Sequence, residues 1–231
     1  MKSTQQEFDA YNASYQQLLD DPIRNVFAGG FRFFHQRKWW LIQEYLRSKV
    51  RDTEKLSWLD VGCGQGDLLK EGAAWFGDAQ GCDMSEGMLK DCAGLNVWLQ
   101  TEGTRLPVAD NSFDFVTSVC VYHHVPIAER LALTAEIVRI LRPGGALCII
   151  EHNPFNPATQ IIVKRTPVDK NAILLPSGMV KSLMLAAGLQ QPEVHNFLFV
   201  PAGLYPSLGW VEAGLKWLPL GGQYAAFGQK L

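Results

Sequence analysis

Short apolar runs alternate with segments of helical periodicity through the middle of the chain. The runs that predict buried strands lie at 56–61, 79–83, 96–100, 113–119 and 146–151. The helical patterns begin at 67, 85 and 129. Strands that alternate with helices form a parallel sheet with helices on both faces. The pattern therefore predicts an α/β fold built on a doubly wound, Rossmann-like sheet.

The N-terminal part of the chain predicts helices that lie outside this alternation. An amphipathic helix over 4–19 is indicated by residues at helical spacing, namely Phe8, Tyr11, Tyr15 and Leu18. A second helix is expected over 31–50. We therefore expect residues 1–50 to form a helical cap on the core.

The C-terminal part predicts one more helix and two more strands. The helix is expected over 177–187, and the strands over 194–200 and 223–228. The segment between these strands, residues 201–221, is apolar on nearly every face, with Trp210 and Trp217 one heptad apart. No repeat or long linker divides the chain. We therefore expect a single domain over 1–231, in which 201–221 is an apolar insert before the last strand.

Two segments that contain proline are expected to interrupt regular structure. Pro143, Gly144 and Gly145 should end a helix at Leu141 and turn the chain into the strand at 146–151. Asn153 and Asn156 each precede a proline, which biases both residues toward extended backbone. The second segment is therefore expected to be a stiff loop, in which each asparagine either starts a turn or is held in place for catalysis.

Three glycines at alternate positions follow the first strand, in the run Leu59-Asp60-Val61-Gly62-Cys63-Gly64-Gln65-Gly66. Glycine is needed at such a turn because the backbone must bend sharply and a ligand must approach bare main chain. Asp83 ends the next strand, at about the 20-residue spacing that lets a carboxylate reach ribose hydroxyls. The motif therefore predicts a nucleoside ligand.

The charge of the loop indicates which nucleoside binds. A dinucleotide motif places a third glycine where this chain has Asp67, and a carboxylate there would repel a pyrophosphate. S-adenosylmethionine carries no phosphate, and its ammonium and sulfonium suit acidic residues such as Asp60 and Asp67. The sequence therefore favours S-adenosylmethionine as the cofactor, with S-adenosylhomocysteine as the product.

The chain resembles the class I S-adenosylmethionine-dependent methyltransferases, in the group that includes the ubiquinone and menaquinone methylases. The motifs that carry the resemblance are LDVGCGQG at 59–66, GCDMS at 81–85, TRLPVADNSFDFV at 104–116, VYHHV at 121–125 and RILRPGG at 139–145. The resemblance implies a seven-stranded, mostly parallel sheet in which strand seven is antiparallel.

The resemblance also implies roles for individual residues. The residues that hold the methionine portion would be Asp60, Gly62, Cys63, Gly64 and Gly66. Asp83 would bind the ribose and Met84 would lie beside the adenine. The edge of the adenine would be bordered by Glu102, Gly103 and Thr104, although the family more often has Asp at the position of Glu102.

Composition and charge exclude some classes of protein. A formal charge of -2 and a pI of about 6.2 argue against a general nucleic-acid or anionic-membrane binder. One basic stretch, from Arg24 to Arg51, is either a solvated helix face or a surface near an anionic acceptor. Five cysteines without C-x-x-C spacing predict buried, reduced thiols. No signal-peptide pattern or membrane-length apolar run occurs, so we expect a cytoplasmic protein.

The catalytic candidates follow the fourth and fifth strands, where ligands bind in a doubly wound sheet. A hydroxyl or ammonium acceptor must lose a proton, and a histidine is a natural base. His123 and His152 are the candidates for this role, and Asn153 is a further catalytic candidate. One residue of the pair His123 and His124 is expected to pack structurally instead.

The substrate pocket is expected to have aromatic walls. The candidate residues are Tyr11, Tyr15, Tyr122 and Phe155, of which Tyr11 and Tyr15 could also contact the sulfonium or simply pack in the core. No metal site is expected, because no pattern such as H-E-x-x-H occurs and the adjacent Glu151 and His152 would point to opposite faces of a strand. The expected acceptor is a small, partly apolar metabolite, methylated at oxygen slightly more readily than at nitrogen or carbon.

Three alternatives stay open at this point. S-adenosylmethionine could be cyclised or cleaved rather than used as a methyl donor, or it could be bound without turnover. The stretch from Arg24 to Arg51 could serve an RNA methyltransferase, although no nucleic-acid partner is expected. The sequence does not determine the oligomeric state.

Overall fold

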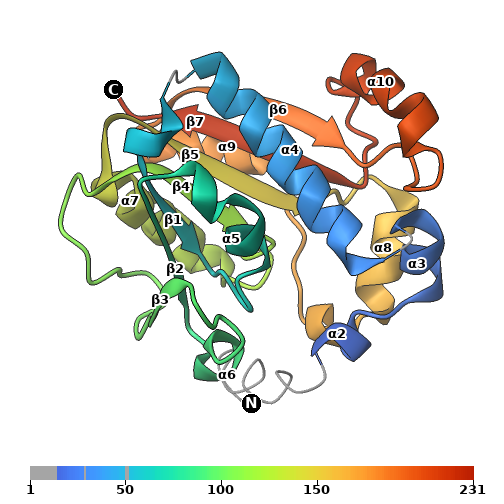
Figure 1. The fold of residues 1–231 in the computed structure, drawn as a ribbon, viewed down its shortest axis with the longest axis horizontal. Helices are drawn as coiled ribbons and strands as arrows, with labels where there is room; N and C mark the ends of the chain where they lie inside the picture. Colours follow the sequence, from blue (N-terminus) through green and yellow to red (C-terminus); the bar gives the residue numbers. More distant parts are fainter. Residues whose placement is uncertain (1–14, 29, 50–51) are drawn as a thin grey trace.

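The structure is a computed structural model of the chain, and it describes residues 15–28, 30–49 and 52–231. Its strands are β1 (Ser57–Val61), β2 (Asp78–Asp83), β3 (Asn96–Leu99), β4 (Phe113–Val119), β5 (Leu141–His152), β6 (Gln190–Phe197) and β7 (Gln223–Gln229). They form one seven-stranded sheet in the order β3-β2-β1-β4-β5-β7-β6 (Figure 1). β1 to β5 pair in parallel, and β7 is antiparallel to both β5 and β6. The predicted doubly wound sheet is confirmed.

The helices of the described residues cover this sheet on both sides. They are α2 (Tyr15–Leu18), α3 (Pro22–Ala28), α4 (Phe31–Lys49), α5 (Asp67–Gly72), α6 (Glu86–Leu89), α7 (Arg130–Ile140), α8 (Pro157–Arg165), α9 (Ser177–Ala186) and α10 (Tyr205–Leu215). Short 3-10 turns include η4 (Ile127–Glu129) and η5 (Pro167–Asp169). No helix in the described part of the chain is long and apolar enough to cross a membrane.

Alternate residues of β1 enter two separate cores. Leu59 belongs to the cluster that contains Ile137 of α7 and Val180 of α9. Trp58 belongs to the cluster of α4 and α5, where its ring stacks on Trp39 at 5.8 Å between centroids. Because successive side chains of a strand point to opposite faces, β1 must be apolar on both sides. This burial fixes the sheet between two helical layers.

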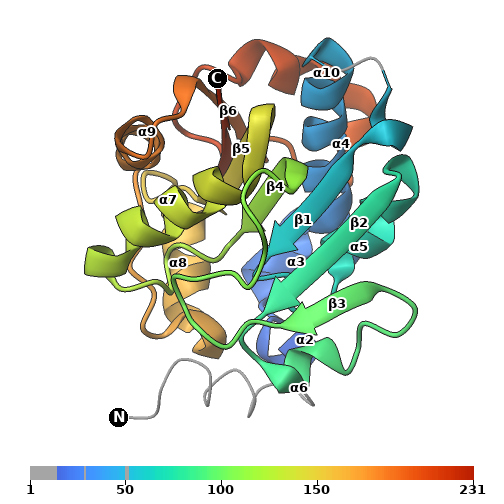
Figure 2. The same ribbon diagram turned by 90° about the vertical axis from the view of Figure 1, so that its left-hand side faces the viewer.

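The carboxyl ends of the parallel strands meet at one edge of the sheet. Figure 2 shows β1, β2 and β3 pointing toward the side where α2 and α6 lie. At the same side α2 packs against η5, and α3 packs against α8. The described part of the predicted cap therefore adjoins the edge where ligands are expected, while Phe8 and Tyr11 lie outside the described residues.

The turn predicted at Pro143–Gly145 was wrong, because this segment belongs to a strand. α7 ends at Ile140 and β5 begins directly at Leu141. The register between β4 and β5 shifts between Phe113 and Phe115. The pairing with β4 passes from Leu141 to Ala146, so a local bulge at residues 142–145 accommodates the proline and the glycines.

Helix α8 takes the place of most of the loop expected after β5. The side chain of Asn156 accepts a hydrogen bond from the N–H of Thr159 at 2.9 Å, which caps the helix, and Pro157 occupies the first helical position. The signal Asn156-Pro157 therefore marks a helix start. β6 spans 190–197, so the strand predicted at 194–200 was placed a few residues too late in the sequence.

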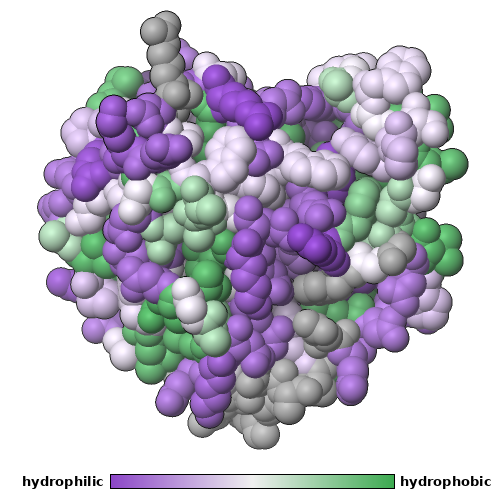
Figure 3. All heavy atoms as spheres, in the orientation of Figure 1, coloured by the Kyte–Doolittle hydropathy of each residue, from purple (hydrophilic) through white to green (hydrophobic). Residues whose placement is uncertain are grey.

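The insert at 201–221 is attached to the core through a buried ion pair. Glu212 of α10 lies 2.6 Å from Nη2 of Arg37 on α4, and it accepts the N–H of Leu198 at 2.8 Å. Trp210 and Trp217 are each 76% exposed. Figure 3 shows pale and green side chains gathered over α10 at the upper right. The insert is therefore held inward by its acidic residue rather than by its tryptophans.

Candidate active site

A cavity of about 490 Å³ opens at the carboxyl ends of β1, β2, β4 and β5. One side is formed by the glycine loop after β1 and by the end of β2, and the other by the segment after β4 and the end of β5. Side chains of α2, α3, α4 and α8 complete its walls. The cavity therefore lies where a doubly wound sheet binds its ligands.

The glycine loop presents bare backbone to this cavity. Gly62 has a φ of +76°, and a Cβ at this position would lie 2.3 Å from Cγ2 of Val121. Gly64 has a φ of +55°, and its N–H donates to Oδ2 of Asp83 at 2.8 Å. L side chains rarely adopt these angles, so both positions favour glycine. The loop therefore offers main chain at the place where the sequence predicted it.

Asp83 is held at the cavity by two backbone groups. Besides Gly64, the N–H of Ser85 donates to its Oδ1 at 2.8 Å. Ser85 in turn caps α6 through the N–H of Met88. A carboxylate can accept about four hydrogen bonds, so these two orient Asp83 while it faces a ligand. The position suits a ribose.

Asp60 is a buried acid at the floor of the same cavity. It is 2% exposed and accepts a hydrogen bond from Oγ1 of Thr117 at 2.5 Å. Burial raises the pKa of Asp60 to about 7, although Thr117 and the charge of Lys38 oppose the shift. A cationic ligand would favour the ionised form, so the residue fits the ammonium or sulfonium of S-adenosylmethionine.

The remaining cofactor residues are placed unevenly. Cys63, Met84 and Gly103 line the cavity as expected. The cavity lining does not include Glu102, Thr104 or Gly66. Gly66 is the N-cap residue of α5.

Gln100 lines the cavity instead of Glu102 and Thr104, and the sequence argument missed it. Its Nε2 donates to the carbonyl oxygens of Glu102 and Gly103, at 2.8 and 3.3 Å. Gln100 is 3% exposed. A polar residue directly after the strand at 96–99 was the available signal for it.

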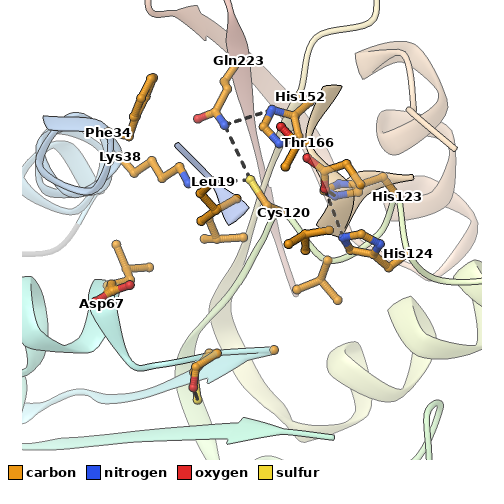
Figure 4. A pocket seen from close by; sticks show the side chains of 18 of the residues that line it. Leu19, Phe34, Lys38, Asp67, Cys120, His123, His124, His152, Thr166 and Gln223 are labelled. Atoms are coloured by element: carbon orange, nitrogen blue, oxygen red, sulfur yellow. Dashed lines mark hydrogen bonds and ion pairs between the residues drawn. The ribbon is translucent and has the colours of Figure 1, made fainter. Parts of the chain in front are cut away.

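A cluster of histidines and carboxylates forms the opposite wall. Nδ1 of His123 lies 2.5 Å from Oε2 of Glu151, and its Nε2 lies 3.4 Å from Oδ1 of Asp169. His124 reaches the same Asp169 oxygen at 3.4 Å. His152 stands beside them, with its ring centroid 5.2 Å from that of His123 (Figure 4). The two predicted histidines are thus brought together, with two acidic partners that the sequence did not reveal.

The carboxylates of Glu151 and Asp169 favour the protonated form of His123. Burial alone would lower its pKa, but Glu151 and Asp169 together raise the pKa of His123 to about 10. His123 in turn holds the pKa of Glu151 and that of Asp169 below their usual ranges, against their burial. Burial lowers the pKa of His124, although Asp169 opposes this. The expectation that His123 titrates near neutrality therefore does not fit its surroundings.

Three polar side chains that the sequence argument did not select complete this wall. Sγ of Cys120 lies 3.6 Å from Nζ of Lys38 and 3.5 Å from Nε2 of Gln223 (Figure 4). The same Gln223 nitrogen lies 3.3 Å from Nδ1 of His152. Burial opposes ionisation of Cys120, but Lys38 and His152 lower its pKa to about 7. Lys38 and Gln223 come from α4 and β7, so only the folded chain brings them together.

The residues predicted for the substrate pocket differ in where they lie. Tyr15 lines the cavity, but Tyr122 does not; it is fully buried, and its hydroxyl pairs with Thr134 at 2.9 Å. Phe155 is 56% exposed and does not line the cavity. Tyr11 lies outside the described residues.

Asn153 is also absent from the cavity wall. It donates to the carbonyl oxygens of Pro219 and Gly221 at 3.1 and 2.8 Å, and its own oxygen accepts the N–H of Phe155. These bonds use its amide to hold the loop before β7. The structure therefore gives Asn153 a structural part in place of the predicted catalytic one.

The sheet order, the glycine loop and the paired acids at Asp60 and Asp83 define a class I S-adenosylmethionine-dependent methyltransferase. Comparison with known proteins agrees. The family profile described as "Methyltransferase domain" matches residues 59–149. S-adenosylmethionine is accordingly the cofactor and S-adenosylhomocysteine the product.

Relatives of known name place the chain more closely. It is 32% identical over 164 residues to the demethylmenaquinone methyltransferase of Staphylococcus saprophyticus. This match covers 64% of this chain and 68% of that protein. The chain belongs to the class I methyltransferases, in the group of the quinone methylases. It is also 29% identical over 153 residues to a tRNA (carboxymethyluridine(34)-5-O)-methyltransferase of Macaca fascicularis, of which it spans only 22% of the length.

Solved structures show the same fold. An S-adenosylmethionine-dependent methyltransferase of Thermotoga maritima has a TM-score of 0.69 at 18% identity, over 99% of this chain and 100% of that one. A phosphoethanolamine N-methyltransferase of Haemonchus contortus, in complex with S-adenosylhomocysteine, has a TM-score of 0.64 at 17% identity. That match covers 100% of this chain and 60% of the other.

Proposed function

We propose that this enzyme methylates an oxygen atom of a small, partly apolar metabolite that carries an acidic hydroxyl group. One observation carries the proposal: a single cavity connects the glycine loop at Gly62 with the polar wall at Lys38 and His152. S-adenosylmethionine supplies an activated methyl group on its sulfonium. Held in line with that methyl, an acceptor gains roughly 7–11 kcal/mol from orientation alone.

The shape of the cavity supports a small acceptor with an apolar body. Its apolar wall is formed by side chains of the N-terminal segment, of α8 and of the segment after β6, chiefly Leu19, Ile23, Phe27, Phe34, Ile162 and Leu198. Such a wall stabilises rings and chains rather than a polypeptide surface. The names of the demethylmenaquinone methyltransferase relatives point to a similar kind of acceptor.

The polar wall supports a hydroxyl that becomes anionic. Lys38 is 6% exposed, and its ammonium faces the cavity beside Cys120, where it stabilises negative charge. Oε1 of Gln223 is buried and has no hydrogen-bond partner among the described residues, so it suits a donor on the acceptor. Both groups favour a methyl acceptor whose hydroxyl donates a hydrogen bond on binding and reacts as an oxyanion.

The proton of the acceptor leaves at the histidine cluster. His123 was predicted to take it, but its two carboxylates already keep that ring protonated. His152 is partly exposed at the cavity wall. Of the two predicted histidines, His152 is therefore the one that we propose as the base if no metal ion is bound. Asn153 has no place in it.

RNA is not the acceptor that we propose, although one relative is named a tRNA methyltransferase. The basic stretch from Arg24 to Arg51 does not form one exposed strip, since Arg37 pairs with buried Glu212 and Lys38 faces the cavity. Binding to nucleic acid depends on exposed cations that neutralise phosphates. We also propose that the enzyme transfers the methyl group rather than cyclising or cleaving the cofactor. We propose the cytoplasm as its location.

The proposal is tested with purified protein and a panel of acceptors. S-adenosylhomocysteine formation is measured with phenols and hydroxylated rings, and in parallel with matched amines that replace the hydroxyl. We expect turnover with hydroxyl acceptors and a product heavier by one methylene unit, placed on oxygen by tandem mass spectrometry. Turnover with the amines alone, or methylthioadenosine in place of S-adenosylhomocysteine, contradicts the proposal.

A further inference from the structure

Three side chains from separate segments converge on one point of the cavity wall. His123 follows β4, His152 ends β5 and Asp169 lies in η5. One ligand atom from each lies within 4.8 Å of the others, and all three line the cavity. We propose that His123, His152 and Asp169 bind one divalent transition-metal ion, and that the acceptor oxygen coordinates this ion.

The spacing within the cluster fits ligands of a common ion. Nitrogen and oxygen ligands lie about 2.0–2.2 Å from zinc, and in a tetrahedral site this places them about 3.4 Å from one another. Nε2 of His123 and Oδ1 of Asp169 are 3.4 Å apart. His124 stands at the same distance from that oxygen. A small movement of His152 toward His123 and Asp169 would complete a set of three ligands.

The groups behind the proposed ligands are those that metal-binding histidines use. A ligating histidine usually donates its second ring N–H to a carboxylate, which fixes the ring orientation. Nδ1 of His123 lies 2.5 Å from Glu151, and Glu151 is fully buried and also accepts the N–H of Tyr122 at 2.7 Å. Nε2 of His123 is thereby directed toward Asp169 and the cavity. The arrangement at His152 differs, because the group 3.3 Å from its Nδ1 is the amide nitrogen of Gln223, which donates rather than accepts.

The donor set indicates the class of metal. Two imidazoles and one carboxylate suit zinc, manganese or ferrous iron, whereas magnesium and calcium prefer oxygen ligands. The ion would displace the proton of His123 on binding, and its divalent charge would then balance the two carboxylates of Glu151 and Asp169. The set leaves coordination positions open toward the cavity.

Those open positions refine the proposed function and depend on it for the identity of the acceptor. An ion that expands from four to five ligands, as zinc sometimes does, offers two open positions beside these three ligands. This favours an acceptor with two adjacent oxygens, such as a ring with neighbouring hydroxyls. Coordination makes a hydroxyl more acidic, so the acceptor would release its proton to water in the cavity, and His152 would act as a ligand rather than as the base. Lys38 lies on the same polar wall and stabilises the resulting oxyanion.

Direct binding of metal tests the inference without any acceptor. The full chain is stripped with a chelator, dialysed, and titrated with Zn²⁺ by calorimetry and with Co²⁺ by visible absorption. We expect one ion per chain, and the Co²⁺ spectrum should indicate nitrogen and oxygen ligands. The variants Asp169→Asn and His152→Asn should each bind Zn²⁺ at least 10-fold more weakly, and Glu151→Gln should lose between 10- and 100-fold.

His195→Asn provides the control, because His195 lies on β6 outside the cavity and should leave Zn²⁺ affinity unchanged. Circular dichroism and S-adenosylhomocysteine binding verify that each variant is folded. Failure of the stripped protein to bind Zn²⁺ or Co²⁺, or unchanged affinity in both ligand variants, overturns the inference. The proposed function fails separately, if no hydroxyl acceptor is methylated with or without metal.

Discussion

The N–H of Gly64 donates to Oδ2 of Asp83 at 2.8 Å, which ties the loop after β1 to the end of β2. The two residues are 19 positions apart in sequence. This bond couples the shape of the glycine loop to the carboxylate that is predicted to bind the ribose. A change at either residue therefore disturbs both halves of the cofactor site.

Asp83→Ala should weaken binding of S-adenosylmethionine strongly. The substitution removes the bonds from Gly64 and Ser85 together with those to the ribose, and a hydrogen bond to a charged group contributes about 1.5–3 kcal/mol. We expect affinity to fall by at least 10-fold in calorimetry. Asp78→Ala, at the other end of β2, is the matched control and should bind normally. Equal affinities in the two variants would exclude a ribose contact at Asp83.

Gly62→Ala should destabilise the fold. A Cβ would lie 2.3 Å from Val121 at a φ of +76°, so we expect a loss of about 1–3 kcal/mol in the free energy of unfolding, measured with urea. Gly178→Ala is the control, since Gly178 is in α9 with no heavy atom within 4 Å of the added Cβ. That variant should gain about 0.5–1 kcal/mol. Equal stability of Gly62→Ala and the wild type would contradict the geometry of the loop.

Cofactor affinity should rise with pH until Asp60 is ionised. Its pKa is raised from 3.8 to about 7 by burial, so the folded protein holds a proton that the unfolded chain has lost across this range. Stability should therefore fall by up to about 4 kcal/mol as pH rises from 4 to 7. A cationic ligand favours ionised Asp60, so binding below pH 7 should release a proton.

Calorimetry at pH 6 in buffers of different ionisation enthalpy measures that proton directly. Asp60→Asn is the comparison, because it is similar in size and does not titrate. We expect the variant to bind more weakly at pH 8 and to lose most of the pH dependence between 6 and 7. Identical proton release by the variant and the wild type would assign the proton to another group.

Breaking the buried pair of Arg37 and Glu212 should cost more than breaking an exposed one. Their side chains are 9% and 4% exposed, so Glu212→Gln leaves a buried cation unpaired and should lower the free energy of unfolding by about 3–5 kcal/mol. Glu193→Gln breaks the exposed pair with Lys49 and should cost no more than about 1 kcal/mol. Similar losses in urea titrations of the two variants would contradict this account of how α10 is attached.

The cofactor half of the site was predictable from sequence because it is local. The glycines and Asp83 belong to consecutive strand ends, and their spacing alone places them together. The central strands β1 and β4 were also found, since nearly all of their residues are buried or half-buried and apolar side chains dominate them. The bulge at Pro143–Gly145 was not, because a turn signal and a bulge use the same residues.

The acceptor half was less predictable because it is assembled from distant segments. His123 and His152 were named from their positions after β4 and at the end of β5. Asp169 of η5 reaches His123, and Lys38 of α4 reaches Cys120 on the same wall, and neither contact was visible in the sequence. Asn153 was misassigned because its partners, the backbone carbonyls before β7, are visible only after folding.

The glycine loop brings bare backbone to one end of the cavity, whereas side chains from α2, α3 and α8 line the other end. Point substitutions alter side chains and leave peptide groups in place. Divergence of this enzyme can therefore change which compound it modifies while its grip on the adenosyl group persists. Substrate range and cofactor use evolve on different parts of one pocket.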